Sequence, residues 1–175
     1  MIRKLGLLAV LFFAVSFVAH AQVEDNKFQV YGGYSYLHFS DNGSFNQNGW
    51  ELQGQYKLFP FLGAVADFSG DYGNGVSTHY FLFGPEVHWP ARVSPFAHVL
   101  IGAAHVGSNF VVGTVPPTFV SASDTSFASA VGGGIDTRIT HGIYWRIFQA
   151  DYIHSSAFSS GQNNVRISTG IVVHF

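Results

Sequence analysis

The chain contains no cysteine, so it has neither a disulfide framework nor thiol chemistry. Charged residues are also scarce, at 10% of the chain, whereas Phe, Tyr and Trp together make up 17%. The eight basic residues are outnumbered by ten acidic ones, and this balance gives no indication of a nucleic-acid partner. Beyond residue 21 no apolar run is long enough for a membrane helix. Any segment that crosses a membrane therefore has to be a β-strand.

The N-terminal segment has the pattern of an export signal. Arg3 and Lys4 precede an apolar run from Leu5 to Val18, and Ala19-His20-Ala21 has the small-x-small form of a cleavage site. The sequence therefore predicts a cleaved Sec-type signal peptide over residues 1–21 and one domain over residues 22–175. Without the two N-terminal cations, six basic residues face ten acidic ones, which gives a formal charge of −4.

The rest of the chain consists of strand-sized segments separated by turn signals. Long connections (41–48, 70–75, 106–124 and 155–163) alternate with short ones. An even number of strands with this alternation is typical of transmembrane barrels. The prediction is an all-β fold, a closed antiparallel eight-stranded up-and-down transmembrane β-barrel. Its strands are expected near Phe28–Phe39, Trp50–Leu58, Leu62–Ser69, Thr78–Trp89, Pro95–His105, Ser126–Arg138, Ile143–His154 and Asn164–Phe175.

Within these strands, apolar and polar residues alternate with a period of two. In a membrane the apolar face has to meet lipid, and the polar face of a barrel this narrow fills its own interior. We therefore expect a network of paired charges that plugs the lumen, because an unpaired buried charge is costly. Its predicted members are Glu51, Lys57, Asp67, Glu86, Asp136, Arg138 and Arg166.

The predicted strand Ile143–His154 does not fit this alternation of outward apolar and inward polar residues. Arg146 has the opposite parity to Gln149 and Asp151, so the three side chains cannot all face inward without a bulge. We interpret Arg146 as reaching toward lipid headgroups, and the register of this strand stays open. Aromatic residues near strand ends are interpreted as interfacial girdles. These residues are Trp50, Tyr80, Trp89, Tyr144, Trp145 and Phe175.

The last strand carries the most specific pattern. Phe175, Val173 and Ile171 lie on one face of a strand that ends the chain on an aromatic residue. Here the chain resembles bacterial outer-membrane β-barrels, whose closing strand ends in this way and is recognised by the assembly machinery. Residues 31–36 (YGGYSY), 83–85 (FGP), 95–98 (PFAH) and 162–166 (QNNVR) resemble the transmembrane domain of OmpA-type proteins. The resemblance is to that barrel alone, and we expect no periplasmic peptidoglycan-binding domain after it.

This resemblance implies a place in the outer membrane of a Gram-negative-type cell envelope. The expected partners are outer-membrane lipids and, during biogenesis, the barrel assembly machinery and periplasmic chaperones. A monomer with a structural or surface-interaction role is expected, with its long loops outside the cell and no cofactor. The sequence does not specify what those loops bind.

Two other functions compete with this one. Some eight-stranded barrels are lipid A acyl hydrolases with a His-x-Ser pair, and His154 and Ser156 have that spacing. No Glu follows Ser156, and Asp151 precedes the pair, so the orienting carboxylate is not at its family position. The remaining histidines have no metal-ligand spacing. We therefore expect a protein that is not an enzyme. The second alternative is a secreted lipocalin-like barrel that binds a small apolar ligand inside.

Overall fold

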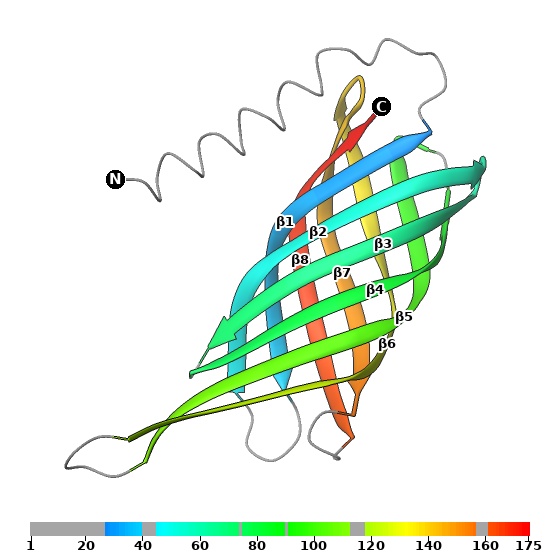
Figure 1. The fold of residues 1–175 in the computed structure, drawn as a ribbon. Helices are drawn as coiled ribbons and strands as arrows, with labels where there is room; N and C mark the ends of the chain where they lie inside the picture. Colours follow the sequence, from blue (N-terminus) through cyan, green and yellow to red (C-terminus); the bar gives the residue numbers. More distant parts are fainter. Residues whose placement is uncertain (1–26, 40–44, 74, 90, 113–117, 157–160) are drawn as a thin grey trace.

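A computed structural model describes residues 27–39, 45–73, 75–89, 91–112, 118–156 and 161–175. The predicted signal peptide lies outside these residues. The described chain forms one closed antiparallel barrel in which each strand pairs with its neighbours in sequence and β1 pairs with β8 (Figure 1). The strands are β1 (Phe28–Phe39), β2 (Phe45–Phe59), β3 (Leu62–Gly73), β4 (Val76–His88), β5 (Val93–Val112), β6 (Thr118–Thr140), β7 (Ile143–Ser155) and β8 (Gln162–His174). The predicted fold class is confirmed.

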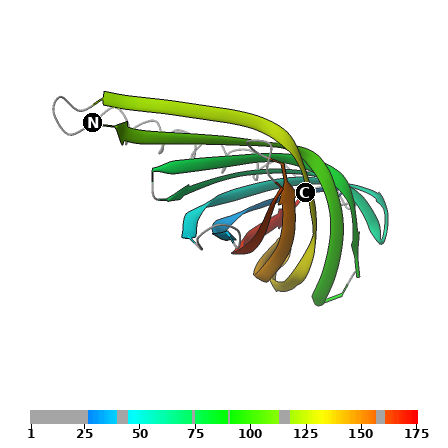
Figure 2. The same cartoon turned by 90° about the horizontal axis from the view of Figure 1, so that it is seen from below.

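The two ends of the barrel differ. One end carries the start of β1, the end of β8 and the β2–β3, β4–β5 and β6–β7 connections, and we call it the short-turn end. The opposite end carries the other four connections, and there β5 and β6 project well past the rest of the barrel (Figure 1). We call it the hairpin end. Seen from below, the projecting ribbon leans to one side of the barrel (Figure 2).

The barrel wall presents apolar side chains outward and polar ones inward. In β2, Leu52 is 45% exposed, whereas its neighbours Glu51 and Gln53 are 1% and 3% exposed. The exposed large residues include Phe, Ile, Val, Tyr and Trp side chains from every strand. Hydrocarbon, unlike water, favours such a surface, and the closed ladder leaves no sheet edge unpaired within the wall. Of the predicted girdle residues, Trp50, Trp89 and Trp145 lie on this outer face, whereas the prediction is wrong for Tyr144, which lines a cavity inside the barrel mouth.

The β5–β6 connection was predicted to be a long loop over residues 106–124, and that prediction is wrong. The two strands stay paired from Val106 opposite Asp124 out to Val112 opposite Thr118. The ladder between β4 and β5 starts only at Ser108, and the ladder between β6 and β7 starts only at Ala128. The segment is rich in Val, Thr and Ser, which suit a two-stranded ribbon as well as a loop. The long connection is therefore a β-hairpin that extends beyond the barrel.

Barrel closure depends on two glycines that face each other across the β1–β8 seam. Gly33 pairs with Gly170. A Cβ atom on Gly33 would overlap the Tyr31 hydroxyl and the Thr169 carbonyl oxygen, and one on Gly170 would overlap the backbone of residues 32–33. The missing side chains leave room for the Tyr31 ring, which lies over the seam inside the barrel. The seam thus closes only with the smallest residue at these positions.

Substituting Gly33→Ala should therefore destabilise the barrel by about 1–3 kcal/mol, the usual cost of overpacking. Urea unfolding in detergent micelles, followed by tryptophan fluorescence, measures this change. The neighbouring Gly32→Ala is the matched control, since a Cβ there meets no atom within 4 Å. Equal losses of stability for the two variants would show that the seam can accommodate a Cβ atom at position 33.

Candidate functional site

Arg166 is the centre of the barrel interior. Its guanidinium Nη2 lies 2.7 Å from Asp151 Oδ2, 2.9 Å from Asp67 Oδ2 and 3.3 Å from Glu51 Oε1. Nη1 donates hydrogen bonds to Asp67 Oδ1 at 3.1 Å and to Ser69 Oγ at 2.8 Å. All of these side chains are buried. One cation therefore holds three carboxyl groups that reach it from β2, β3 and β7.

Arg146 is the centre of a second cluster, and the prediction that it reaches toward headgroups is wrong. The side chain is 2% exposed, and Nε donates to Asp136 Oδ1 at 2.8 Å. Its guanidinium carbon lies 4.4 Å from the ring centre of Tyr31 and 4.1 Å from that of Phe96, on the faces of both rings. The register of β7 shifts against β8 between Arg146 and Gln149. This bulge lets Arg146 and Gln149 both point inward although their parities differ.

Neutral amides connect the two arginine clusters. Arg146 Nη1 donates at 2.6 Å to both Gln53 Oε1 and Gln149 Oε1. The Gln53 amide in turn donates to Glu51 Oε1 at 2.6 Å, and the Gln149 amide donates to the same oxygen at 2.7 Å. His98 extends the network, with Nε2 lying 2.8 Å from Asp151 Oδ1. The result is one continuous polar network across the lumen, in which the two arginines and the two glutamines each have several partners.

Part of the interior is apolar. This cluster consists of Leu37, Val65, Tyr80, Leu82, Leu100, Ala104, Ala128, Ala130 and Ile153. Tyr80 was predicted to be a girdle residue, and that prediction is wrong. It is 1% exposed, and Asn164 Nδ2 donates to its hydroxyl at 3.1 Å. Its inward parity, shared with Leu82, decides its position, whereas nearness to the strand end does not.

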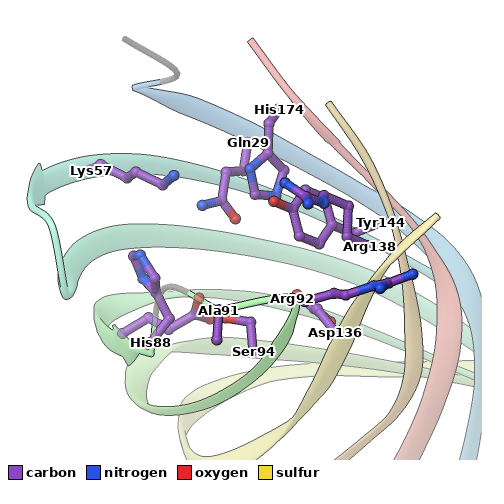
Figure 3. Close-up of a pocket in the computed structure, with 11 residues that line it drawn as sticks. Gln29, Lys57, His88, Ala91, Arg92, Ser94, Asp136, Arg138, Tyr144 and His174 are labelled. Carbon is purple, nitrogen blue, oxygen red and sulfur yellow. The ribbon is translucent and has the colours of Figure 1, made fainter. Parts of the chain in front are cut away.

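The predicted network members lie in two different environments, the buried interior and an open cavity. Glu51, Asp67, Glu86, Asp136 and Arg166 are all buried inside. The other two, Lys57 and Arg138, line an open cavity of about 360 Å³ at the short-turn end, where Lys57 is half-buried and Arg138 is exposed (Figure 3). Placing Arg138 within the buried network was wrong, because an inward-facing residue this close to a strand end is no longer enclosed by the barrel.

Buried side chains fill the interior beneath this cavity. A void there has a volume of about 10 Å³ and is lined by Tyr31, Gln53, Glu86 and Arg146, among others. That is no more than the space for one water molecule. We therefore expect the purified protein to show no steady, porin-sized conductance in planar bilayers. Long-lived channels of that size would contradict a plugged lumen.

The predicted acyl-hydrolase pair is not assembled. His154 Nδ1 lies 2.9 Å from the amide oxygen of Asn163, so an amide occupies the place that a carboxylate would need for orienting the base. Within the described part of the chain no hydrogen bond joins His154 to Ser156. Nor do the described residues contain a group of three or more His, Asp or Glu side chains that could hold a metal ion.

The residues that sequence reasoning missed were Gln53, His98, Arg146, Gln149 and Asp151. For Gln53 the parity was visible, since it shares the inward face with Glu51, but neutral amides were not counted as network members. For Arg146 the signal was misleading, because a bulge cannot be seen in a period-two count.

In the described ranges, the structure has no helix of the length and apolarity needed to cross a membrane.

No protein-family model and no curated protein sequence matches this chain. Solved structures do match. Neisserial surface protein A is similar with a TM-score of 0.66 and 15% identity, covering 85% of this chain and 97% of that one. Ail, the attachment invasion locus protein of Yersinia pestis, gives a TM-score of 0.61 at 18% identity over 83% and 97% of the two chains.

A third match is the N-terminal β-barrel domain of Pseudomonas aeruginosa OprF, with a TM-score of 0.53 and 12% identity, covering 86% of this chain and 98% of that domain. These identities are low, so what the three structures share with this chain is the fold. That shared fold agrees with the strand order, the closed ladder and the outward apolar face described above. The chain has the fold of the small eight-stranded outer-membrane β-barrels.

Proposed function

We propose that this protein is an integral outer-membrane β-barrel that acts without catalysis, as a structural and surface-binding element of the cell envelope. The observation that carries the proposal is the inverted barrel wall. Large apolar side chains cover the outside, and a hydrogen-bonded network of charged and amide groups fills the inside. A wall of this kind is stable in a bilayer and prone to aggregate in water.

The same observation argues against the lipocalin-like alternative. A soluble barrel of that type needs a polar outside and an apolar cavity for its ligand. Here Phe81 and Phe83 point outward at 52% and 60% exposure, while Arg166 at the centre is 0% exposed. The acyl-hydrolase alternative also gains no support, because Asn163 stands beside the His154 base.

We further propose that the hairpin end faces the outside of the cell and that the β5–β6 hairpin is its binding surface. An even-stranded barrel keeps both chain ends on the periplasmic side, which places the short-turn end there. The hairpin continues past its last pairing with β4 at Ser108 and with β7 at Ala128, so its outer part is a two-stranded ribbon with two side edges. Strand edges of this kind accept a further strand from a partner.

Charge narrows the class of partner. Ail of Yersinia pestis has been crystallised with the heparin analogue sucrose octasulfate. In the present chain the Lys and Arg residues after position 26 are Lys27, Lys57, Arg92, Arg138, Arg146 and Arg166, and none of them lies in the hairpin. A sulfated polyanion would therefore find no Lys or Arg on the β5–β6 hairpin. A strand-forming peptide segment fits the ribbon better.

An epitope tag tests the topology. Inserted directly before Thr118 in the hairpin, it should be reachable by antibody on intact cells, because the hairpin is expected to lie outside. The matched control is the same tag after His141, in a turn of the short-turn end, which should be labelled only after permeabilisation. Both proteins should fractionate with the outer membrane. The opposite labelling pattern would refute the orientation, and recovery in the soluble fraction would refute the membrane proposal.

A further inference from the structure

The open cavity at the short-turn end differs in charge from the interior beneath it. Its wall includes Lys57 from β2, Arg138 from β6 and Arg92 from the β4–β5 turn, with Lys57 and Arg92 on opposite sides (Figure 3). Its wall also contains Tyr144 and His174, whose rings are stacked with centroids 4.1 Å apart at an angle of 11°. Three cations from three separate elements thus line one open space of about 360 Å³.

The acidic residues of the cavity wall are engaged elsewhere. Asp136 accepts two hydrogen bonds from Arg146, at 2.8 and 3.1 Å. Glu86 Oε2 lies 3.4 Å from His98 Nδ1. Among the described residues no ion pair joins either carboxylate to a cation of the cavity wall. The charge that the wall presents to its contents is therefore positive.

The distribution of cations along the barrel supports a specific role for this end. Of the six Lys and Arg residues after position 26, two are the buried arginines of the lumen. The other four are Lys27, Lys57, Arg92 and Arg138, and all lie at the short-turn end. Lys27 lies just before β1, where its carbonyl oxygen accepts a hydrogen bond from the Lys57 backbone, but its side chain is not part of the cavity wall.

We propose that this cavity, whose wall carries Lys57, Arg92 and Arg138, binds an oxyanion of the phosphate class. Guanidinium groups match the geometry of phosphate oxygens, and an ammonium group adds a point charge. Buried side chains fill the lumen beneath the cavity, so we expect an anion to enter and leave at the short-turn end. Its source is either a soluble phosphate or the headgroup of an anionic lipid at the rim. The site is separate from the hairpin and does not depend on the surface-binding role proposed above.

Phosphate titration of the folded, full-length barrel tests the proposal. The protein is placed in zwitterionic lipid nanodiscs at constant ionic strength, and the arginine side-chain NMR signals are followed while inorganic phosphate replaces chloride. We expect saturable shifts of Arg92 and Arg138. The triple variant Lys57→Gln, Arg92→Gln, Arg138→Gln should weaken phosphate binding roughly tenfold or more, followed by the phosphorus signal, since several charge-assisted hydrogen bonds are lost. Lys27→Gln, which removes a cation from the same end but not from the cavity, should leave the affinity within about twofold.

Nanodiscs that contain phosphatidylglycerol identify the source. Weaker apparent phosphate affinity in them would assign the site to a lipid headgroup, and unchanged affinity would assign it to a soluble anion. The proposal fails if the shifts do not saturate, or if Lys27→Gln and the triple variant weaken binding equally. Either result would mean that the three cations only balance the acidic residues of the interior. Circular dichroism and heat-modifiable migration show that each variant is folded before it is titrated.

Discussion

Replacing Arg166 by Ala should lower the free energy of unfolding by about 3–5 kcal/mol, the usual cost of leaving a buried charge without its partner. The guanidinium lies within 3.3 Å of carboxylate oxygens of Glu51, Asp67 and Asp151, and all four side chains are buried. Its removal leaves three carboxyl groups facing one another around a cavity. Urea unfolding in lipid vesicles, followed by tryptophan fluorescence, measures the loss.

Two further variants separate the causes of that loss. Arg138→Ala removes a cation from the exposed mouth of the same barrel and should change stability by no more than about 0.5 kcal/mol. Arg166→Met keeps most of the volume but not the charge, so it should stay clearly destabilised. If Arg166→Met unfolds like the wild type, the cost in the Ala variant comes from the cavity and the ion-pair network contributes little. A loss in Arg138→Ala as large as that in Arg166→Ala would contradict the assignment of the network's centre.

The number, order and pairing of the strands were predictable from sequence because hydrocarbon imposes a strict alternation. Each strand has to present apolar residues at every second position, and this requirement leaves a clear period of two in β2 and β8. The same counting placed Glu51 and Arg166 on the face that the structure gives them. Parity does not show which inward residues touch. The contact between Arg166 and Asp67 joins residues that are 99 positions apart.

Counting residues with a period of two gave wrong positions where the strand pairing is irregular and where a strand ends. The register shift beside Arg146 reverses the parity on its two sides, and a bulge leaves no mark in a hydrophobic pattern. Arg138 has the right face but lies so near the end of β6 that the mouth leaves it exposed. The β5–β6 hairpin was predicted to be a long connection with Pro116 and Pro117 at its centre. A two-stranded ribbon that projects beyond the barrel does not need an alternation of apolar and polar residues, so a period-two count does not reveal its strands.

Removing Phe175 should greatly reduce the amount of assembled barrel in the outer membrane. Two interactions are lost together in the deletion. One is the backbone pairing that closes the seam, in which Phe175 N–H donates to Phe28 carbonyl oxygen at 2.8 Å. The other is the terminal aromatic side chain, which, with Val173 and Ile171, we expect the assembly machinery to recognise. Heat-modifiable protein in the outer-membrane fraction measures the assembled amount.

The variant Phe175→Ala separates recognition from stability. It keeps the backbone hydrogen bond to Phe28 and removes only the ring, so the purified protein should refold in detergent micelles as well as the wild type does. In cells, where assembly depends on recognition, it should accumulate poorly, as the deletion does. His174→Ala is the matched control, since that side chain stacks on Tyr144 and lines the cavity at the short-turn end. Normal cellular levels of Phe175→Ala would show that the ring is not part of the assembly signal. Poor refolding in detergent would instead assign the defect to closure of the β1–β8 seam.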